Sequence, residues 1–217
     1  MSFLARLSVI DDLTRPDHFY LIPQDRCYYF GDYTARGGYA YSETNRLILN
    51  LKKPVSQASQ NHYRYKHHAI QQIAQALQHS LDLQHITFVP VPPSKAHADP
   101  AYDDRLVQVL HTLTTQAPNA HYRELILQDQ SLPAAHETQQ RPNPITLAKH
   151  YRIDTQQLTD IREHLVIFDD VLTTGCHFKA MQRVLHRHLP NHAIIGVFVA
   201  RRVPGSQTPD EINASNQ

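Results

Sequence analysis

The stretch that decides the fold is VIFDDVLTTGCHFKAM, residues 166–181. An apolar run leads into two adjacent aspartates, and two threonines and a glycine then open a segment whose apolar spacing predicts a helix over 175–188. Neighbouring carboxylates at the end of a buried strand repel each other and lose hydration, so a positive or hydroxyl-rich group has to compensate them. The central question is therefore what faces Asp169 and Asp170.

The pattern on both sides of this stretch predicts an α/β fold. Apolar runs at 86–91, 164–168 and 193–200 predict buried strands, and 124–128 is a further strand candidate. Helical spacing predicts helices over 42–53, 65–77, 102–113 and 175–188. This alternation is typical of a parallel twisted sheet with helices on both faces.

The regions outside the core differ from it in composition. Aromatic and polar residues alternate around Gly37 and Gly38, which predicts short strands joined by a glycine turn. We expect an N-terminal hood with its lead-in segment over 1–64, a core over 65–203 and a disordered tail over 204–217. The polar, proline-rich stretch 129–163 is too long for a simple connector, so we expect a flexible insertion there.

Charge and cysteine content limit the function classes. The formal net charge is +1, with 21 Lys and Arg against 20 Asp and Glu, which gives no signal for a nucleic-acid or membrane surface. The two cysteines, Cys27 and Cys176, are predicted to be free thiols in a reducing cytoplasm, because no secretory leader is recognisable. No apolar run approaches membrane-spanning length.

The acid pair and the segment after it suit a ligand with two kinds of group. In open α/β sheets, ligands bind at the carboxyl ends of the strands, where we expect Asp169 and Asp170. Thr173, Thr174 and Gly175 open the helix, so their N–H groups, the hydroxyls and the helix dipole favour an anion. A sugar phosphate meets both demands, because its hydroxyls donate to carboxylates while its phosphate occupies the loop.

On these residues, VIFDDVLTTG resembles the phosphoribosyl pyrophosphate (PRPP) binding motif of type I phosphoribosyltransferases, and FVPVPPSK (88–95) is similar to the family's pyrophosphate loop. The resemblance implies that Asp169 and Asp170 are the catalytic pair, which hold the ribose hydroxyls and, partly through water, Mg²⁺. It implies that the 5-phosphate is bound by Leu172, Thr173, Thr174, Gly175, Cys176 and His177. It also implies pyrophosphate contacts from Ser94 and Lys95, and we expect a further contact from Arg141 on a flexible hood that also carries His136 and Lys149.

The order of segments is most similar to the ComF-like group of phosphoribosyltransferase-domain proteins. The shared order is a tyrosine-containing segment, a lysine pair (Lys52 and Lys53), PVP, a long polar insertion and the acid motif. Two features depart from that group: the four-cysteine zinc segment is absent, and AYDDRL (101–106) replaces an arginine-glycine-phenylalanine-asparagine stretch. These departures weaken a role in DNA uptake and leave PRPP binding unaffected.

The resemblance implies a pentosyltransferase that uses Mg²⁺, transfers phosphoribose to a nitrogenous acceptor and releases pyrophosphate. A PRPP- or nucleotide-sensing regulator, a ComF-like DNA-processing accessory, and a hydrolase or phosphorylase remain alternatives, because the motif supports ligand binding under each. The acceptor cannot be deduced from one sequence. A homodimer, which is common in the family, also stays open.

Simpler explanations compete for several residues. The acid pair alone also suits a strand end before a helix, where acids are favoured. Cys176 is better explained as a small, partly buried residue, and the histidine pairs 67–68 and 186–188 as solvated helix faces. The basic residues within 52–66 fit an ordinary surface better than a nucleic-acid patch. The aromatic residues within 28–41 fit packing and stacking on an acceptor base almost equally.

Overall fold

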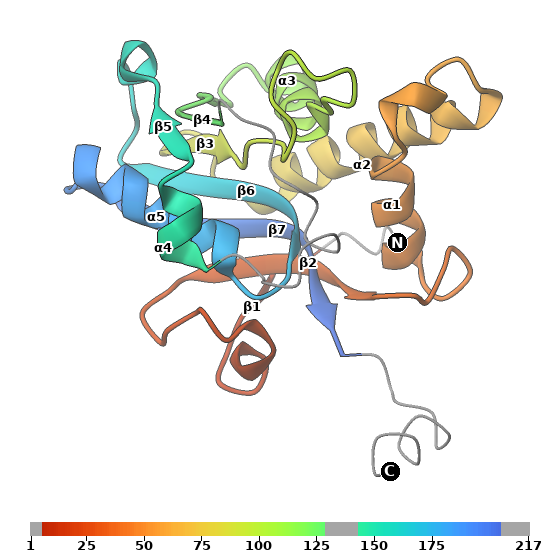
Figure 1. Ribbon diagram of the computed structural model, residues 1–217, viewed down its shortest axis with the longest axis horizontal. Coiled ribbons are helices and arrows are strands. Elements are labelled where there is room, and N and C mark those ends of the chain that lie inside the picture. Colours follow the sequence, from red (N-terminus) through yellow and green to blue (C-terminus); the bar gives the residue numbers. More distant parts are fainter. Residues whose placement is uncertain (1–5, 129–142, 205–217) are drawn as a thin grey trace.

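The computed structural model describes residues 6–128 and 143–204 and has an α/β fold (Figure 1). The main sheet contains, in spatial order, β1 (Ser8–Val9), β2 (Cys27–Thr34), β7 (Ala193–Val203), β6 (His164–Leu172) and β3 (Ile86–Pro90). β1 is antiparallel to β2, and the other three pairings are parallel. A separate antiparallel pair is formed by β4 (Ile126–Gln128) and β5 (Tyr151–Ile153).

Helices flank this mostly parallel sheet. α1 (Glu43–Leu51), α2 (Arg64–Ser80) and α3 (Arg105–Gln116) pack on one another in that order, and α5 (Cys176–His188) packs with α4 (Pro144–Ala148). Short 3-10 helices are η1 (Arg15–His18), η2 (Val55–Gln57), η3 (Asn61–Tyr63) and η4 (Thr155–Gln157). Among the described residues, no helix combines the length and apolarity needed to cross a membrane.

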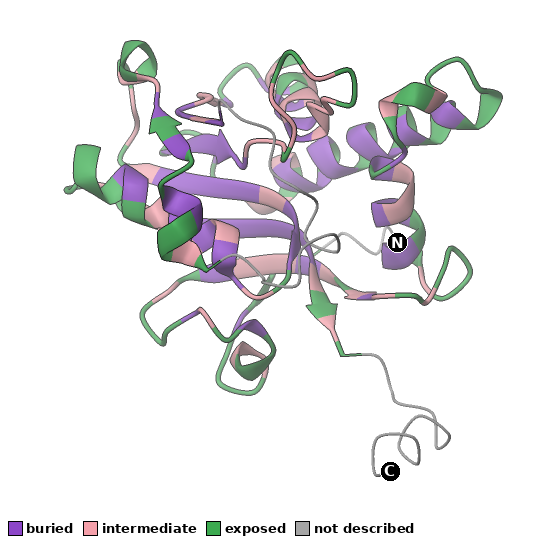
Figure 2. Ribbon diagram, viewed as in Figure 1, coloured by how far each residue is buried: buried purple, intermediate pink, exposed green. Residues whose placement is uncertain are grey.

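The central strands are covered on both faces. Residues 165–168 of β6 are all buried, and Figure 2 shows the same burial along the neighbouring strands and the inward faces of the helices. Continuous burial of this kind is expected for parallel strands between helix layers. The expected strands and helices of the core are therefore confirmed, but some details differ. The strand expected at 124–128 is β4, which pairs with β5 outside the main sheet. α3 begins at Arg105, because the residues before it form a turn in which Tyr102 N–H donates to Asp99 O over 2.8 Å.

β6 also continues beyond the expected strand end. The sequence predicts a strand over 164–168 with the two aspartates after it, but pairing with β7 includes Asp169 opposite Phe198 and Leu172 opposite Arg201. The two carboxylates therefore belong to the last part of β6. Successive strand residues alternate in direction, yet both side chains reach the one cavity at the end of the strand.

The N-terminal segment differs from the expected small sheet. It contains one eight-residue strand, β2, which pairs with β7 in the main sheet, and after Gly37 and Gly38 the chain enters α1 directly. The buried Asn45 of α1 fixes this geometry, because its side chain accepts from Thr34 N–H over 3.0 Å and donates to Thr34 O over 2.8 Å. Ser42 caps the helix by accepting from Asn45 N–H over 3.0 Å.

Candidate functional site

A cavity of about 280 Å³ lies at the carboxyl ends of β3 and β6. One edge of β3 pairs with β6, and Phe88 of β3 also forms a parallel bridge with Tyr122. The segments that follow β3 in the chain therefore lie on both sides of it. Ligands bind at this kind of crevice in open α/β sheets. The lining residues are Lys52, Val91, Pro92, Pro93, Ser94, Asp103, Asp104, Arg105, Leu106, Val107, Asp169, Asp170, Val171, Thr173 and His177.

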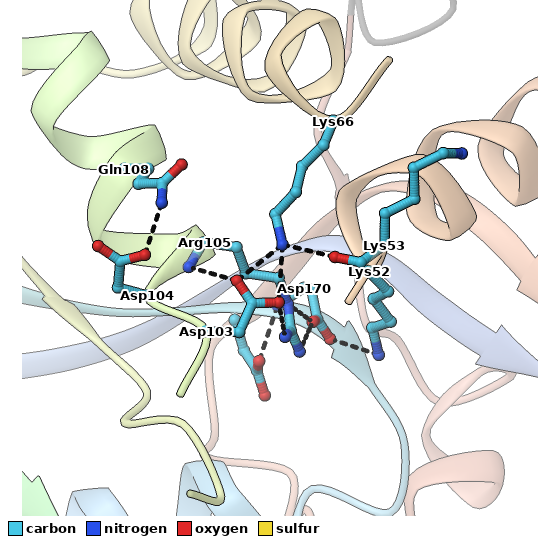
Figure 3. Close-up of polar contacts among 9 residues, drawn as sticks. Lys52, Lys53, Lys66, Asp103, Asp104, Arg105, Gln108 and Asp170 are labelled. Carbon is cyan, nitrogen blue, oxygen red and sulfur yellow. Dashed lines mark hydrogen bonds and ion pairs between the residues drawn. The ribbon is translucent and has the colours of Figure 1, made fainter. Parts of the chain in front are cut away.

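Asp170 is a buried carboxylate held by two cations. It is 4% exposed, and its Oδ1 lies 2.9 Å from Lys52 Nζ. Its Oδ2 accepts from Arg105 Nε over 2.9 Å and lies 2.7 Å from Arg105 Nη2 (Figure 3). Burial alone would raise the pKa of Asp170, but Lys52 and Arg105 outweigh it and hold the pKa far below the usual range. This carboxylate is therefore ionised at neutral pH.

Asp169 has the opposite electrostatic character. It is half-buried, and its Oδ1 accepts from the backbone N–H of Asp170 over 2.7 Å. Burial and the charge of Asp170 raise the pKa of Asp169 to about 7. The two adjacent acids are therefore unequal: Lys52 and Arg105 keep Asp170 ionised at neutral pH, whereas Asp169 exchanges its proton near neutral pH.

The cations at Asp170 belong to a longer ion network. Arg105 Nη1 lies 3.0 Å from Asp103 Oδ2, and Lys66 Nζ lies 2.7 Å from Asp103 Oδ1. The Lys66 ammonium also donates to Lys53 O over 2.8 Å (Figure 3). Lys66 is fully buried, whereas the sequence predicts an exposed side chain. The reason is that Asp103 and the Lys53 carbonyl replace the water that its ammonium would otherwise require.

The loop after the acid pair leads into the helix as expected. Thr173 is exposed, Thr174 is half-buried, and Gly175 caps α5 with a φ of 84°, in the left-handed region that glycine adopts readily. His177 lies in the first turn of α5 and lines the cavity. Its Nδ1 lies 2.8 Å from Tyr151 Oη. Cys176 is buried, and burial raises its thiol pKa to about 11, so it is not an activated nucleophile.

The residues that were expected to bind pyrophosphate do not lie together in one cavity. Ser94 lines the cavity that contains the aspartates, and its carbonyl accepts from Gln128 Nε2 over 2.8 Å. Lys95 lines a second cavity of about 280 Å³, which shares 91–93 with the first and contains Glu124. Lys149 is an exposed residue at the end of α4. Arg141 and His136, with most of the tail, lie outside the described residues.

Lys52 and Arg105 are the two cations of the site that the sequence did not identify. Lys52 was assigned to an ordinary surface and Arg105 to a helix, and no local pattern connects either with Asp170. One signal was present: an unusual AYDDRL stretch puts Arg105 at the start of a helix soon after the pyrophosphate-like loop. Leu172, at the start of the phosphate-like loop, is buried and packs in the core.

The acid pair suits a metal ion that is coordinated mainly by a bound phosphate compound and water, with few protein ligands. In the described part of the chain, no group of three or more His, Cys, Asp or Glu side chains could hold a metal ion. Both oxygens of Asp170 face Lys52 or Arg105, so Asp169 is the carboxylate of the pair that can turn to a metal. This fits Mg²⁺, which commonly takes one or two carboxylates and otherwise phosphate oxygens and water.

Comparisons with known proteins leave the family open. No protein-family model matches the chain, and no curated protein is significantly similar to it. The chemistry of the cavity and its surrounding loops therefore carries the functional conclusion.

Proposed function

We propose that the chain has the type I phosphoribosyltransferase fold, binds PRPP or a related ribose phosphate with Mg²⁺, and transfers phosphoribose to a nitrogenous acceptor. One observation carries the proposal. A single cavity brings together the acid pair of β6, the loop that opens α5, the Ser94 loop and two cations. These groups match the hydroxyls, the 5-phosphate and the diphosphate of such a ligand.

Each part of the ligand has a counterpart in the cavity. The 5-phosphate is assigned to 173–177, where the first N–H groups of α5 and the helix dipole favour an anion. The ribose hydroxyls are assigned to Asp169, whose ionised form accepts hydrogen bonds. Lys52 and Arg105 line the same cavity, and their positive charge favours the diphosphate. They therefore take the role that the sequence assigned to Lys95 and Arg141.

In the proposed reaction, an acceptor nitrogen attacks C1 of the ribose while pyrophosphate leaves. The side chains contribute position and charge, since Lys52 and Arg105 stabilise the negative charge that develops on the leaving group. Mg²⁺ would supply further charge neutralisation at the diphosphate, with Asp169 as its protein ligand.

A sensor that binds PRPP without transfer is the second candidate. One observation favours it: both oxygens of Asp170 are already engaged by Lys52 and Arg105. Only Asp169 is then left for the ribose and the metal, which is a smaller donor set than the sequence implies. Pyrophosphate release in the presence of purine and pyrimidine bases separates a transferase from a sensor.

The binding test uses a pair of adjacent lysines. Lys52 lines the cavity, whereas Lys53 points to Tyr39 and Asn50, with Nζ 3.1 Å from Tyr39 Oη and 2.6 Å from Asn50 Oδ1. We expect Lys52→Met to weaken PRPP binding in calorimetry with Mg²⁺ by about tenfold or more, the loss of a charge-assisted contact. Lys53→Met should change it by less than about threefold, within roughly 0.7 kcal/mol. Absence of PRPP binding to the wild type would refute the proposed function.

A further inference from the structure

An N-terminal segment packs against the loop that we assign to phosphate. This segment, residues 17–21, is called the N-terminal clasp below. His18 is fully buried, and its Nδ1 is hydrogen-bonded to the carbonyl oxygen of Thr173. The backbone N–H of Tyr20 donates to the carbonyl oxygen of Thr174 over 3.0 Å. Two consecutive carbonyls of the loop are therefore held by residues more than a hundred positions away in the chain.

The clasp also closes tightly over Gly175. A Cβ at this position would lie 2.8 Å from Leu21 Cδ2 and 3.0 Å from Leu21 Cγ. The first distance is shorter than real Cβ contacts and the second is tighter than most of them, so a side chain at 175 would displace the Leu21 side chain. Glycine is therefore favoured here both by the positive φ and by the packing of the clasp.

Holding the carbonyls determines where the amides point. In a trans peptide the N–H is directed opposite to the C=O, and the described peptides are all trans. The Thr173 carbonyl shares its peptide with Thr174 N–H, and the Thr174 carbonyl shares its peptide with Gly175 N–H. Both N–H groups therefore point away from the clasp and precede the first-turn N–H groups of α5. Successive N–H groups in such a turn form a concave site for an anion.

His18 holds its carbonyl as a neutral ring. Nδ1 of His18 must carry a hydrogen in order to donate to Thr173 O. Nε2 of the same ring is buried and has no hydrogen-bond partner among the described residues. Burial lowers the pKa of His18 despite the raising effects of the Thr173 carbonyl and Asp17, and Arg201 of β7 lowers it further. Arg201 Nη1 also lies 3.0 Å from Asp17 Oδ2, which anchors the clasp to the sheet.

We propose that the N-terminal clasp is part of the ligand site, with His18 as a positioning residue that sets the amides of Thr174 and Gly175 for a phosphate. The proposal rests on the proposed function in one respect, the assignment of a phosphate to this loop. Acidification should weaken phosphate binding, because a second proton on His18 would be buried at Nε2 beside Arg201 without a partner.

The test compares two substitutions of similar size. In His18→Asn the amide nitrogen can replace Nδ1 as donor, whereas His18→Leu has no donor. With ribose 5-phosphate as the probe, calorimetry should show a loss of about tenfold or more for His18→Leu, near the 1.4 kcal/mol of a hydrogen bond, and less than about threefold for His18→Asn. Affinity should fall more steeply from pH 7 to pH 5 in wild type than in His18→Asn. Equal losses in both variants, or none in His18→Leu, would overturn the proposal.

A second measurement separates this proposal from the proposed function. In NMR spectra of the free protein, the amide signals of Thr174 and Gly175 should shift in His18→Leu and stay near their wild-type positions in His18→Asn. If wild type binds neither ribose 5-phosphate nor PRPP, the phosphate assignment falls with the proposed function and the clasp has no role in a ligand site. If binding occurs but the amide signals are unchanged in His18→Leu, the clasp proposal alone fails.

Discussion

Asp169 and Asp170 show what one sequence can and cannot reveal about a charged site. Two adjacent acids at a strand end require compensation, and this much follows from the sequence alone. The residues that compensate Asp170, Lys52 and Arg105, come from other elements, and their meeting depends on the fold. The resemblance gives the two carboxylates the same role, whereas in the structure the pKa of Asp170 is lowered and that of Asp169 is raised.

The raised pKa of Asp169 predicts a gain in stability when its charge is removed. Its folded pKa of about 7 lies above the ordinary 3.8, so between these values the folded state binds more protons than the unfolded state. The free energy of unfolding should therefore fall as pH rises through this window. Asp169→Asn should be more stable than wild type at pH 8 by on the order of 1–2 kcal/mol, and close to it at pH 5. Urea unfolding at both pH values measures this.

The matched control is Asp82→Asn, which removes the same charge from an exposed loop position. Its effect should be small and nearly equal at pH 5 and pH 8. A variant at Asp169 whose effect does not grow with pH would contradict the assignment of the titrating carboxylate. If the proposed function holds, the same substitution should also weaken binding of PRPP with Mg²⁺, since stability and ligand binding make opposite demands on this side chain.

At the scale of elements, the spacing of apolar residues predicts which faces of helices and strands are buried. It does not predict which element packs beside them. The core strands and helices follow from apolar spacing, because each has a face or a whole strand that must leave water. The segment of β2 was expected to form short strands joined by a glycine turn in an N-terminal hood. It pairs with β7 in the main sheet instead, because alternating aromatic residues do not encode which strand lies beside them. The extension of β6 through both aspartates is likewise set by pairing with β7, which local sequence does not contain.

The turn from β6 into α5 gives a prediction with an internal control. Gly175 and Gly38 both have positive φ, 84° and 72°, but only at Gly175 does an added Cβ meet other atoms, namely those of Leu21. Gly38→Ala should cost about 1 kcal/mol of unfolding free energy from backbone strain alone. Gly175→Ala should cost about 2–4 kcal/mol, because strain and overpacking add. Equal costs in urea unfolding would mean that Leu21 does not restrain the loop.

At the scale of the whole molecule, the ion network connects elements that are distant in sequence. Lys66 of α2, Asp103, Arg105 of α3, Asp170 of β6 and Lys52 after α1 form one chain of contacts. The near-neutral composition gives no indication of this, because a sum over charges does not report their positions. The fold places opposite charges together in its interior, so the site is also supported by α2, none of whose residues lines the cavity.

This connection predicts that substitutions at its two ends are not independent. Lys66→Met leaves Asp103 without its buried cation, and Asp170→Asn leaves Arg105 with one acid fewer, so each should cost about 3 kcal/mol. The double variant should depart from the sum of the two single effects by about 1 kcal/mol or more, because Asp103 and Arg105 link the two sites.

The control cycle combines Lys66→Met with Lys179→Met, since Lys179 pairs with Asp25 over 2.7 Å and shares no partner with Lys66. That pair should add within about 0.5 kcal/mol. Urea unfolding at one pH measures both cycles, and additivity in the first would show that the network is a set of independent pairs.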